Sequence, residues 1–236
     1  MNRLEKFIYL YKNTESKLLL RHFENKTGIK HFRDMTKHIN KIAPVIIDGG
    51  ANHGMHTLLF KIYFPKSIVY AFEPQKLESL DLIAKEFDSV HIVHCLIGEK
   101  NKSKVALNFT NSSDRATTLD LIDKPVLETK DFKMVSLDDW AMKNYIDHVD
   151  IIKIDVEGYD YQALLGAQNL LKKAKILFIE IHFQNMFGDK QFYFDDVYKL
   201  VKSFGFKLFR FYDLGNDERG FVKNGNAMFV KNEQKG

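Results

Sequence analysis

Acidic side chains stand at the ends of several short apolar stretches in this sequence. Asp48, Glu73 and Asp155 each end or directly follow such a stretch, and Glu180 and His182 lie at the end of another. Carboxylates in such places can accept hydrogen bonds from ligand hydroxyls or act as general bases. Histidine has an ordinary pKa that suits proton transfer near neutral pH. These residue types therefore indicate a polar ligand site with proton-transfer chemistry.

A glycine-rich turn follows the first apolar stretch. It reads Asp-Gly-Gly-Ala-Asn-His-Gly from Asp48 to Gly54, and a helical pattern begins after it. Glycines allow a sharp turn and a close approach of the backbone. A helix N-terminus presents unpaired N–H groups to polar ligand atoms. We expect Asp48, Gly50, Asn52 and Gly54 to bind a nucleotide-like cofactor.

The details of this turn narrow the choice of cofactor. Ala51 stands where the dinucleotide fingerprint needs its middle glycine, and no Gly-Lys-Ser/Thr ending of a P-loop follows. Glu73, 19 residues after Gly54, suits a ribose diol, which NAD and S-adenosylmethionine both carry. The register Asp48-x-Gly50-x-x-x-Gly54 suits an amino-acid cofactor whose ammonium meets Asp48. The turn favours S-adenosylmethionine and leaves NAD as the alternative.

Alternating strands and helices must position these residues. We predict strands over 45–48, 67–72, 90–96, 150–155 and 174–182, and helices over 54–63, 77–87, 161–173 and 194–204. This alternation predicts an α/β fold with a doubly wound, Rossmann-like parallel sheet and ligands at the carboxyl ends of its strands. Two last strands, over 206–212 and 227–230, predict an antiparallel hairpin at the sheet edge.

An insertion interrupts the alternation over residues 103–137. Two stretches with strand-like alternation, 103–110 and 132–137, flank the polar loop 111–118. We interpret the segment as a small hairpin-like β insertion near the mouth of the site. Arg115 and Thr117 in its loop are expected to close over the ligand and bind substrate.

The chain divides into two parts in this interpretation. Residues 1–43 are polar with helical spacing of their apolar residues, which predicts N-terminal helices packed as an appendage. Residues 44–236 form the cofactor-binding domain.

Three motifs together resemble the FkbM family of S-adenosylmethionine-dependent methyltransferases. They are Asp48-Gly49-Gly50-Ala51-Asn52-His53-Gly54, then Tyr70-Ala71-Phe72-Glu73-Pro74, then Ile152-Lys153-Ile154-Asp155-Val156-Glu157-Gly158 with Leu164-Leu165-Gly166-Ala167. The likeness covers about residues 44–183. It implies the class I methyltransferase sheet of seven strands with an antiparallel last strand, a place for Glu73 and Pro74 in cofactor binding, and O-methylation of sugars or other hydroxylated metabolites.

Methyl transfer to a hydroxyl needs alignment of the acceptor and help with its proton. We expect Asp155, Glu157 and His182 to serve in catalysis and Glu180 in substrate binding. The alternatives are that Asp155 accepts backbone N–H groups, that Glu157 caps the following helix and that Glu180 and His182 form a strand-end pair. These four side chains could also bind Mg²⁺ or Mn²⁺, which is the less favoured interpretation.

Composition excludes several other classes. The 236 residues carry a formal net charge of +4 without a dense basic cluster, so no nucleic-acid partner is expected. The single Cys95 excludes an intramolecular disulfide. No apolar run approaches the ~20 residues of a membrane span, and no apolar signal-peptide core follows the start, so we expect a cytoplasmic protein. The expected partner is a small-molecule or glycan acceptor. An NAD-dependent oxidoreductase and a non-catalytic cofactor-binding assembly subunit are the alternatives.

Overall fold

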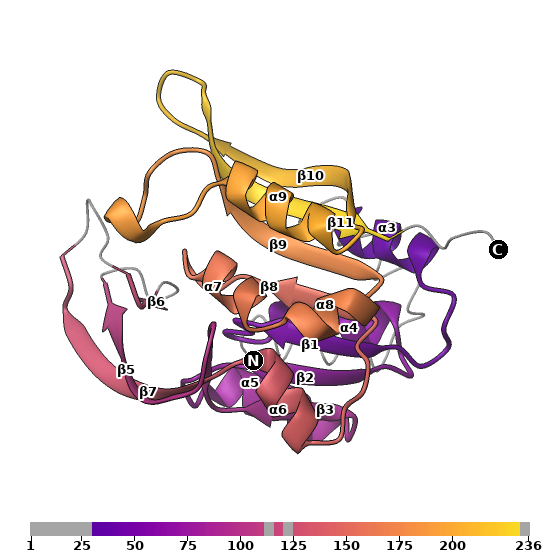
Figure 1. Ribbon diagram of the computed structural model, residues 1–236. Coiled ribbons are helices and arrows are strands. Elements are labelled where there is room, and N and C mark those ends of the chain that lie inside the picture. The colour runs from indigo at the N-terminus through magenta and orange to yellow at the C-terminus, as the bar shows by residue number, and fades with distance from the viewer. Residues whose placement is uncertain (1–29, 111–115, 120–124, 232–236) are drawn as a thin grey trace.

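A seven-stranded sheet forms the centre of the computed structural model, which describes residues 30–110, 116–119 and 125–231 (Figure 1). Its strand order is β10-β11-β9-β8-β1-β2-β3. The strands are β1 (Val45–Gly49), β2 (Ile68–Phe72), β3 (Val90–Val93), β8 (Ile151–Ile154), β9 (Ile176–His182), β10 (Lys207–Asn216) and β11 (Val222–Val230). Neighbours from β3 to β9 run parallel, whereas β11 is antiparallel to both β9 and β10. The predicted class I methyltransferase sheet is confirmed.

Helices cover both faces of this sheet. One face carries α3 (Lys30–His38), α4 (Met55–Tyr63) and α5 (Glu78–Glu86). The other carries α6 (Leu137–Lys143), α7 (Asp160–Leu165), α8 (Gln168–Lys173) and α9 (Phe194–Ser203). All four residues of β8 are buried, which explains its run of aliphatic residues around Lys153. None of the helices in the described ranges is long and apolar enough to cross a membrane.

The single helix predicted over 161–173 is wrong, because α7 and α8 are separate. They are divided at Gly166, where a Cβ atom would lie 2.0 Å from the carbonyl oxygen of Gly98. The carboxylate of Asp138 accepts the N–H groups of Asn169 and Leu170, at 2.8 and 3.0 Å. A residue from α6 therefore caps the start of α8, and only the folded chain brings it there.

The third predicted strand is also divided. β3 ends at Val93, and the next two residues turn the chain into β4 (Leu96–Ile97), which pairs with a second sheet. That sheet has the order β4-β7-β5-β6, with β5 (Lys102–Phe109), β6 (Ala116–Thr117) and β7 (Glu128–Val135). β5 and β7 pair antiparallel, as expected of a hairpin, but β4 and β6 extend them into a four-stranded sheet. It stands beside the carboxyl ends of the central strands (Figure 1).

The N-terminal part of the chain is described from residue 30 onward. α3 buries Phe32 and Met35 in the same apolar cluster as α4. Asp34 accepts hydrogen bonds from Arg210 and Tyr212 of β10, at 3.0 and 2.8 Å. α3 is thus fastened to the sheet, and the division of the chain at residue 43 stays a prediction.

Candidate active site

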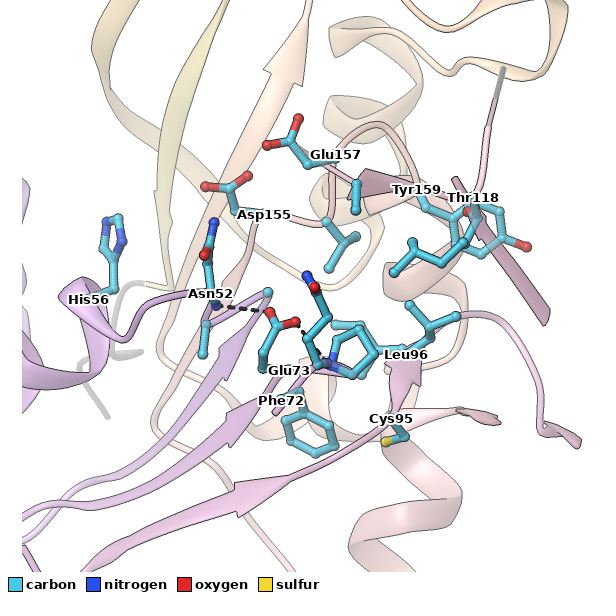
Figure 2. Close-up of a pocket in the computed structure, with 18 of the residues that line it drawn as sticks. Asn52, His56, Phe72, Glu73, Cys95, Leu96, Thr118, Asp155, Glu157 and Tyr159 are labelled. Carbon is cyan, nitrogen blue, oxygen red and sulfur yellow. Dashed lines mark hydrogen bonds between the residues drawn. The ribbon is translucent and has the colours of Figure 1, made fainter. Parts of the chain in front are cut away.

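A cavity of about 360 Å³ opens at the carboxyl ends of β1, β2 and β8 (Figure 2). Its size lies within the range of roughly 300–1,000 Å³ that small-molecule sites occupy. The small sheet forms its far wall through Leu96, Ile97 and Leu107. The predicted position of the site, at the carboxyl edge of the sheet, therefore coincides with a cavity. The predicted residues that line it are Gly50, Asn52, Glu73, Pro74, Asp155 and Glu157.

The glycine turn adopts a left-handed backbone at three positions. The φ angles are 72° at Gly50, 48° at Asn52 and 82° at Gly54. The N–H groups of Gly50 and Ala51 both donate to the carbonyl of Phe72, at 3.0 and 2.9 Å, and so fasten the turn to the end of β2. These φ values explain the glycines at positions 50 and 54, since most L-residues avoid this conformation.

Close packing against protein sets a second requirement for glycine. A Cβ atom on Gly50 would lie 1.8 Å from the carbonyl oxygen of Asp155, and one on Gly54 would lie 2.5 Å from the Ile83 side chain. Gly54 directly precedes α4 and is not among the residues that line the cavity. The sequence led us to expect that glycines let the backbone come close to the cofactor. At Gly50 and Gly54 the backbone instead comes close to the tip of β8 and to α5.

Glu73 lies on the cavity floor with both carboxylate oxygens already oriented. Oε2 accepts the N–H of Asn52 and Oε1 accepts the N–H of Gln75, each at 3.0 Å (Figure 2). Burial raises the pKa of Glu73 above its ordinary value, while the two N–H donors favour the ionised form. Each oxygen retains capacity for a further donor, as a ribose diol would need. Sequence reasoning missed Gln75, whose backbone is the second donor.

Asp48 lies beneath the turn rather than on the cavity wall. It is fully buried, and its Oδ2 accepts the hydroxyl of Thr57 at 2.6 Å. Its Oδ1 is 3.1 Å from the ammonium of Lys153. Asp48 is not among the cavity-lining residues of the described chain, so its predicted part in cofactor binding would be indirect.

The turn after β8 is organised by an aspartate that sequence reasoning overlooked. Asp160 accepts the N–H of Val156 through Oδ1 and the N–H of Gly158 through Oδ2, both at 3.0 Å. Glu157 has a φ of 52° within this turn. The side chains of Asp155 and Glu157 line the cavity on the side that is uppermost in Figure 2. The common Asx-turn pattern gave no signal for this role, because in that turn the side chain accepts an N–H further along the chain, whereas Asp160 accepts N–H groups that precede it.

Glu180 and His182 gather with Asp160 behind this turn. Their potential ligand atoms all lie within 4.8 Å of one another, and His182 Nε2 is 3.4 Å from Glu180 Oε2. Burial, followed by the charges of Glu180 and Asp155, raises the pKa of Asp160 to about 7. One imidazole and two carboxylates could hold a divalent metal. The sequence predicted one group of four side chains, but the structure divides it. Asp155 and Glu157 line the cavity, whereas Glu180 and His182 do not.

The insertion reaches the turn through Thr117. Its hydroxyl donates to the carbonyl of Glu157 at 2.6 Å, and its side chain is buried. The flanking residues Ala116 and Thr118 line the cavity, but Thr117 itself does not. Arg115 lies outside the described residues. Substrate binding by Arg115 and Thr117 therefore stays a prediction.

The strand order, with a cavity at the carboxyl ends of the parallel strands, is that of the class I methyltransferase fold. A family model described as the methyltransferase FkbM domain matches residues 48–208. The chain belongs to the FkbM family of S-adenosylmethionine-dependent methyltransferases, as its motifs predicted, and not to the NAD-dependent oxidoreductases.

Two individual proteins illustrate the likeness. The 2-O-methyltransferase NoeI of Sinorhizobium fredii is 23% identical over 177 residues, which are 68% of this chain and 72% of that protein. The crystal structure of a methyltransferase FkbM from Methylobacillus flagellatus superposes with a TM-score of 0.50 at 15% identity. That superposition covers 80% of this chain but only 44% of the other, so the M. flagellatus protein is much longer than the shared part.

Proposed function

We propose that this chain transfers the methyl group of S-adenosylmethionine to a hydroxyl of a sugar, a glycan precursor or another small metabolite. The observation that carries the proposal is the cavity of about 360 Å³ with Glu73 on its floor and Asp155 and Glu157 on its upper side. The similarity to a protein named as a 2-O-methyltransferase supports oxygen as the acceptor atom.

The residues of the cavity suit this cofactor. Glu73 can accept hydrogen bonds from both ribose hydroxyls, because each of its oxygens is oriented by one backbone N–H. Leu96, Ile97 and Leu107 offer apolar surface for a flat base. S-adenosylmethionine supplies a methyl group already activated on a positively charged sulfur. The carboxylates of Asp155 and Glu157 add negative charge on the same cavity wall.

Asp155 and Glu157 are the best-placed groups to act on the acceptor. Each can accept a hydrogen bond from a hydroxyl and turn its oxygen lone pair toward the methyl group. Asp160 accepts the N–H of Val156, which lies between them in the sequence, and Thr117 donates to the carbonyl of Glu157. His182 is not among the cavity-lining residues, so we assign it a role through Asp160 and the turn rather than direct proton removal.

Glu73→Gln should weaken the binding of S-adenosylhomocysteine about tenfold, since the amide accepts one hydrogen bond fewer and carries no charge. Isothermal titration calorimetry measures the dissociation constant. Glu78→Gln is the matched control, because Glu78 is exposed on α5 and lies outside the cavity. Unchanged affinity in Glu73→Gln would remove the ribose assignment. No binding to the wild-type protein would contradict the proposed function.

Asp155→Asn should retain S-adenosylhomocysteine affinity within about threefold but lose about 10²–10⁴-fold in methyl transfer if Asp155 is the general base. The assay offers radiolabelled S-adenosylmethionine with extracted nucleotide sugars and glycans and identifies the labelled product. Glu157→Gln is measured in parallel. Full activity in both variants would rule out both as the base. A wild-type protein that binds the cofactor yet labels no acceptor would favour the non-catalytic alternative.

A further inference from the structure

A buried ammonium lies directly beneath the glycine turn. Lys153 is the third residue of β8, and its side chain is 2% exposed. Its Nζ donates to the carbonyls of Gly49 and Gly50, at 3.1 and 2.9 Å, and lies 3.1 Å from Asp48 Oδ1. Of the three N–H donors of the ammonium, two serve the carbonyls of the turn, and Asp48 supplies the opposite charge as an ion pair.

The carbonyls that Lys153 binds belong to the turn that borders the cavity. Gly50 and Ala51 donate their N–H groups to Phe72, and Asn52 donates its N–H to Glu73. In a trans peptide, the C=O of one residue and the N–H of the next point in opposite directions. A hydrogen bond from Lys153 to a carbonyl of the turn therefore also fixes the direction of the following N–H. Lys153 thereby fixes the orientation of the peptide groups that lead to Asn52.

We propose that Lys153 is a positioning residue for the cofactor: its ammonium orients the glycine turn so that Asn52 and Glu73 meet and present the ribose-binding carboxylate. Asp48 serves as the counter-ion of Lys153 in this arrangement, which assigns it an indirect part in binding. The inference rests on the proposed function, because the ligand of the turn is taken to be S-adenosylmethionine.

The charges around Lys153 are consistent with this role. Burial opposes an ammonium, but the neighbouring carboxylates of Asp48 and Asp155 together raise the pKa of Lys153 above its ordinary value. Buried ion pairs seldom stabilise a fold more than apolar side chains of the same volume would. Ile151, Ile152 and Ile154 show that this strand otherwise uses aliphatic residues. A lysine here is thus better explained by its hydrogen bonds to the turn than by fold stability.

A second buried lysine provides a matched control. Lys61 in α4 is 1% exposed, and its Nζ donates to the carbonyls of Pro65 and Ser67 and to the hydroxyl of Ser89, at 3.0, 2.5 and 2.8 Å. It resembles Lys153 in burial and in its backbone acceptors. It is not among the residues that line the cavity.

The experiment compares Lys153→Met with Lys61→Met in two measurements. Calorimetry with S-adenosylhomocysteine should show a loss of affinity of at least about tenfold in Lys153→Met and none beyond about twofold in Lys61→Met. Hydrogen–deuterium exchange of the cofactor-free protein should show faster exchange in the segment 49–54 for Lys153→Met but not for Lys61→Met. The second readout tests the positioning of the turn even if the ligand is a different one.

A double variant separates positioning from stability. Asp48→Asn combined with Lys153→Met leaves no unpaired buried charge, so it should recover the unfolding midpoint lost in Lys153→Met and remain deficient in ligand affinity. It also serves if Lys153→Met alone does not fold. Wild-type affinity and wild-type exchange in either Lys153 variant would overturn the inference, as would an equal loss of affinity in Lys61→Met. A wild-type protein that fails to bind S-adenosylhomocysteine would instead contradict the proposed function.

Discussion

Replacing Gly50 with alanine should lower the free energy of unfolding by about 4 kcal/mol, within the range of severe single substitutions. The new Cβ atom would lie 1.8 Å from the carbonyl oxygen of Asp155, and the φ of 72° is unfavourable for alanine. The obstructing atom belongs to the backbone of a central strand end, so no side-chain rotation relieves the contact. The tips of β1 and β8 would have to separate, and urea denaturation measures the cost.

Gly205→Ala is the control for this substitution. Gly205 has a φ of 84°, and a Cβ atom there would meet nothing within 4 Å. It carries the backbone penalty without the contact, so we expect a loss of about 1 kcal/mol. The difference between the two variants measures the close approach of Gly50 to Asp155. Equal losses of stability in the two variants would show that the contact with the Asp155 carbonyl does not restrict which residue position 50 can hold.

Acidification to pH 5 should lower the free energy of unfolding by about 2 kcal/mol less in His31→Phe than in the wild-type protein. The His31 ring stacks on Phe178 with centroids 4.4 Å apart, and neither ring nitrogen has a hydrogen-bond partner among the described residues. Burial, helped by His56 and Lys153, lowers the pKa of His31 from 6.5 to about 3. Phenylalanine keeps the ring and removes the titration.

The sign of this effect follows from proton binding. Between pH 6.5 and about 3 the unfolded state binds a proton at His31 and the folded state does not, so stability falls as the pH drops through this window. About 1.5 pH units below 6.5, at about 1.36 kcal/mol each, give the expected 2 kcal/mol. His56, whose pKa burial and Lys153 also lower to about 3, should contribute in the same direction.

Asp160 opposes this trend. Its raised pKa, from 3.8 to about 7, means that the folded state binds the extra proton, so its contribution to stability falls as the pH rises through that window. The wild-type profile therefore contains both effects, and only a difference between proteins isolates one histidine. Denaturation of wild type and His31→Phe at pH 8 reports packing alone, and the change in their difference at pH 5 reports the titration. An unchanged difference would contradict the lowered pKa of His31.

Residues close in the sequence determined the main elements of the site. The glycine turn between β1 and α4 and the strand that ends before Glu73 follow from short-range patterns of apolar and glycine residues. Parallel strands bring their carboxyl ends to one edge, so the sequence alone was enough to group Glu73, Asp155 and Glu157 around one site. The family resemblance rested on the same local motifs.

Tertiary contacts decided which of these side chains line the cavity. Asp48 looked like a cofactor ligand because its partner Lys153 is far away in the sequence and meets it only through the pairing of β1 with β8. Likewise, Asp160 joins Glu180 and His182 only when α7 packs beside β9. The break after α7 depends on Gly98 and Asp138, which come from other elements.

The glycine turn shows both contributions at one place. The sequence by itself determined that a strand must enter a glycine-rich turn and a helix, because glycine is the residue that tolerates a left-handed backbone without cost. Only the tertiary structure decided that the nearby Asp155 carbonyl leaves no room for a side chain at Gly50. The same holds for the hydrogen bond that Lys153 donates to the carbonyl of Gly50. These are contacts between β1 and β8, whose closeness depends on the order of strands in the folded sheet and not on spacing along the chain.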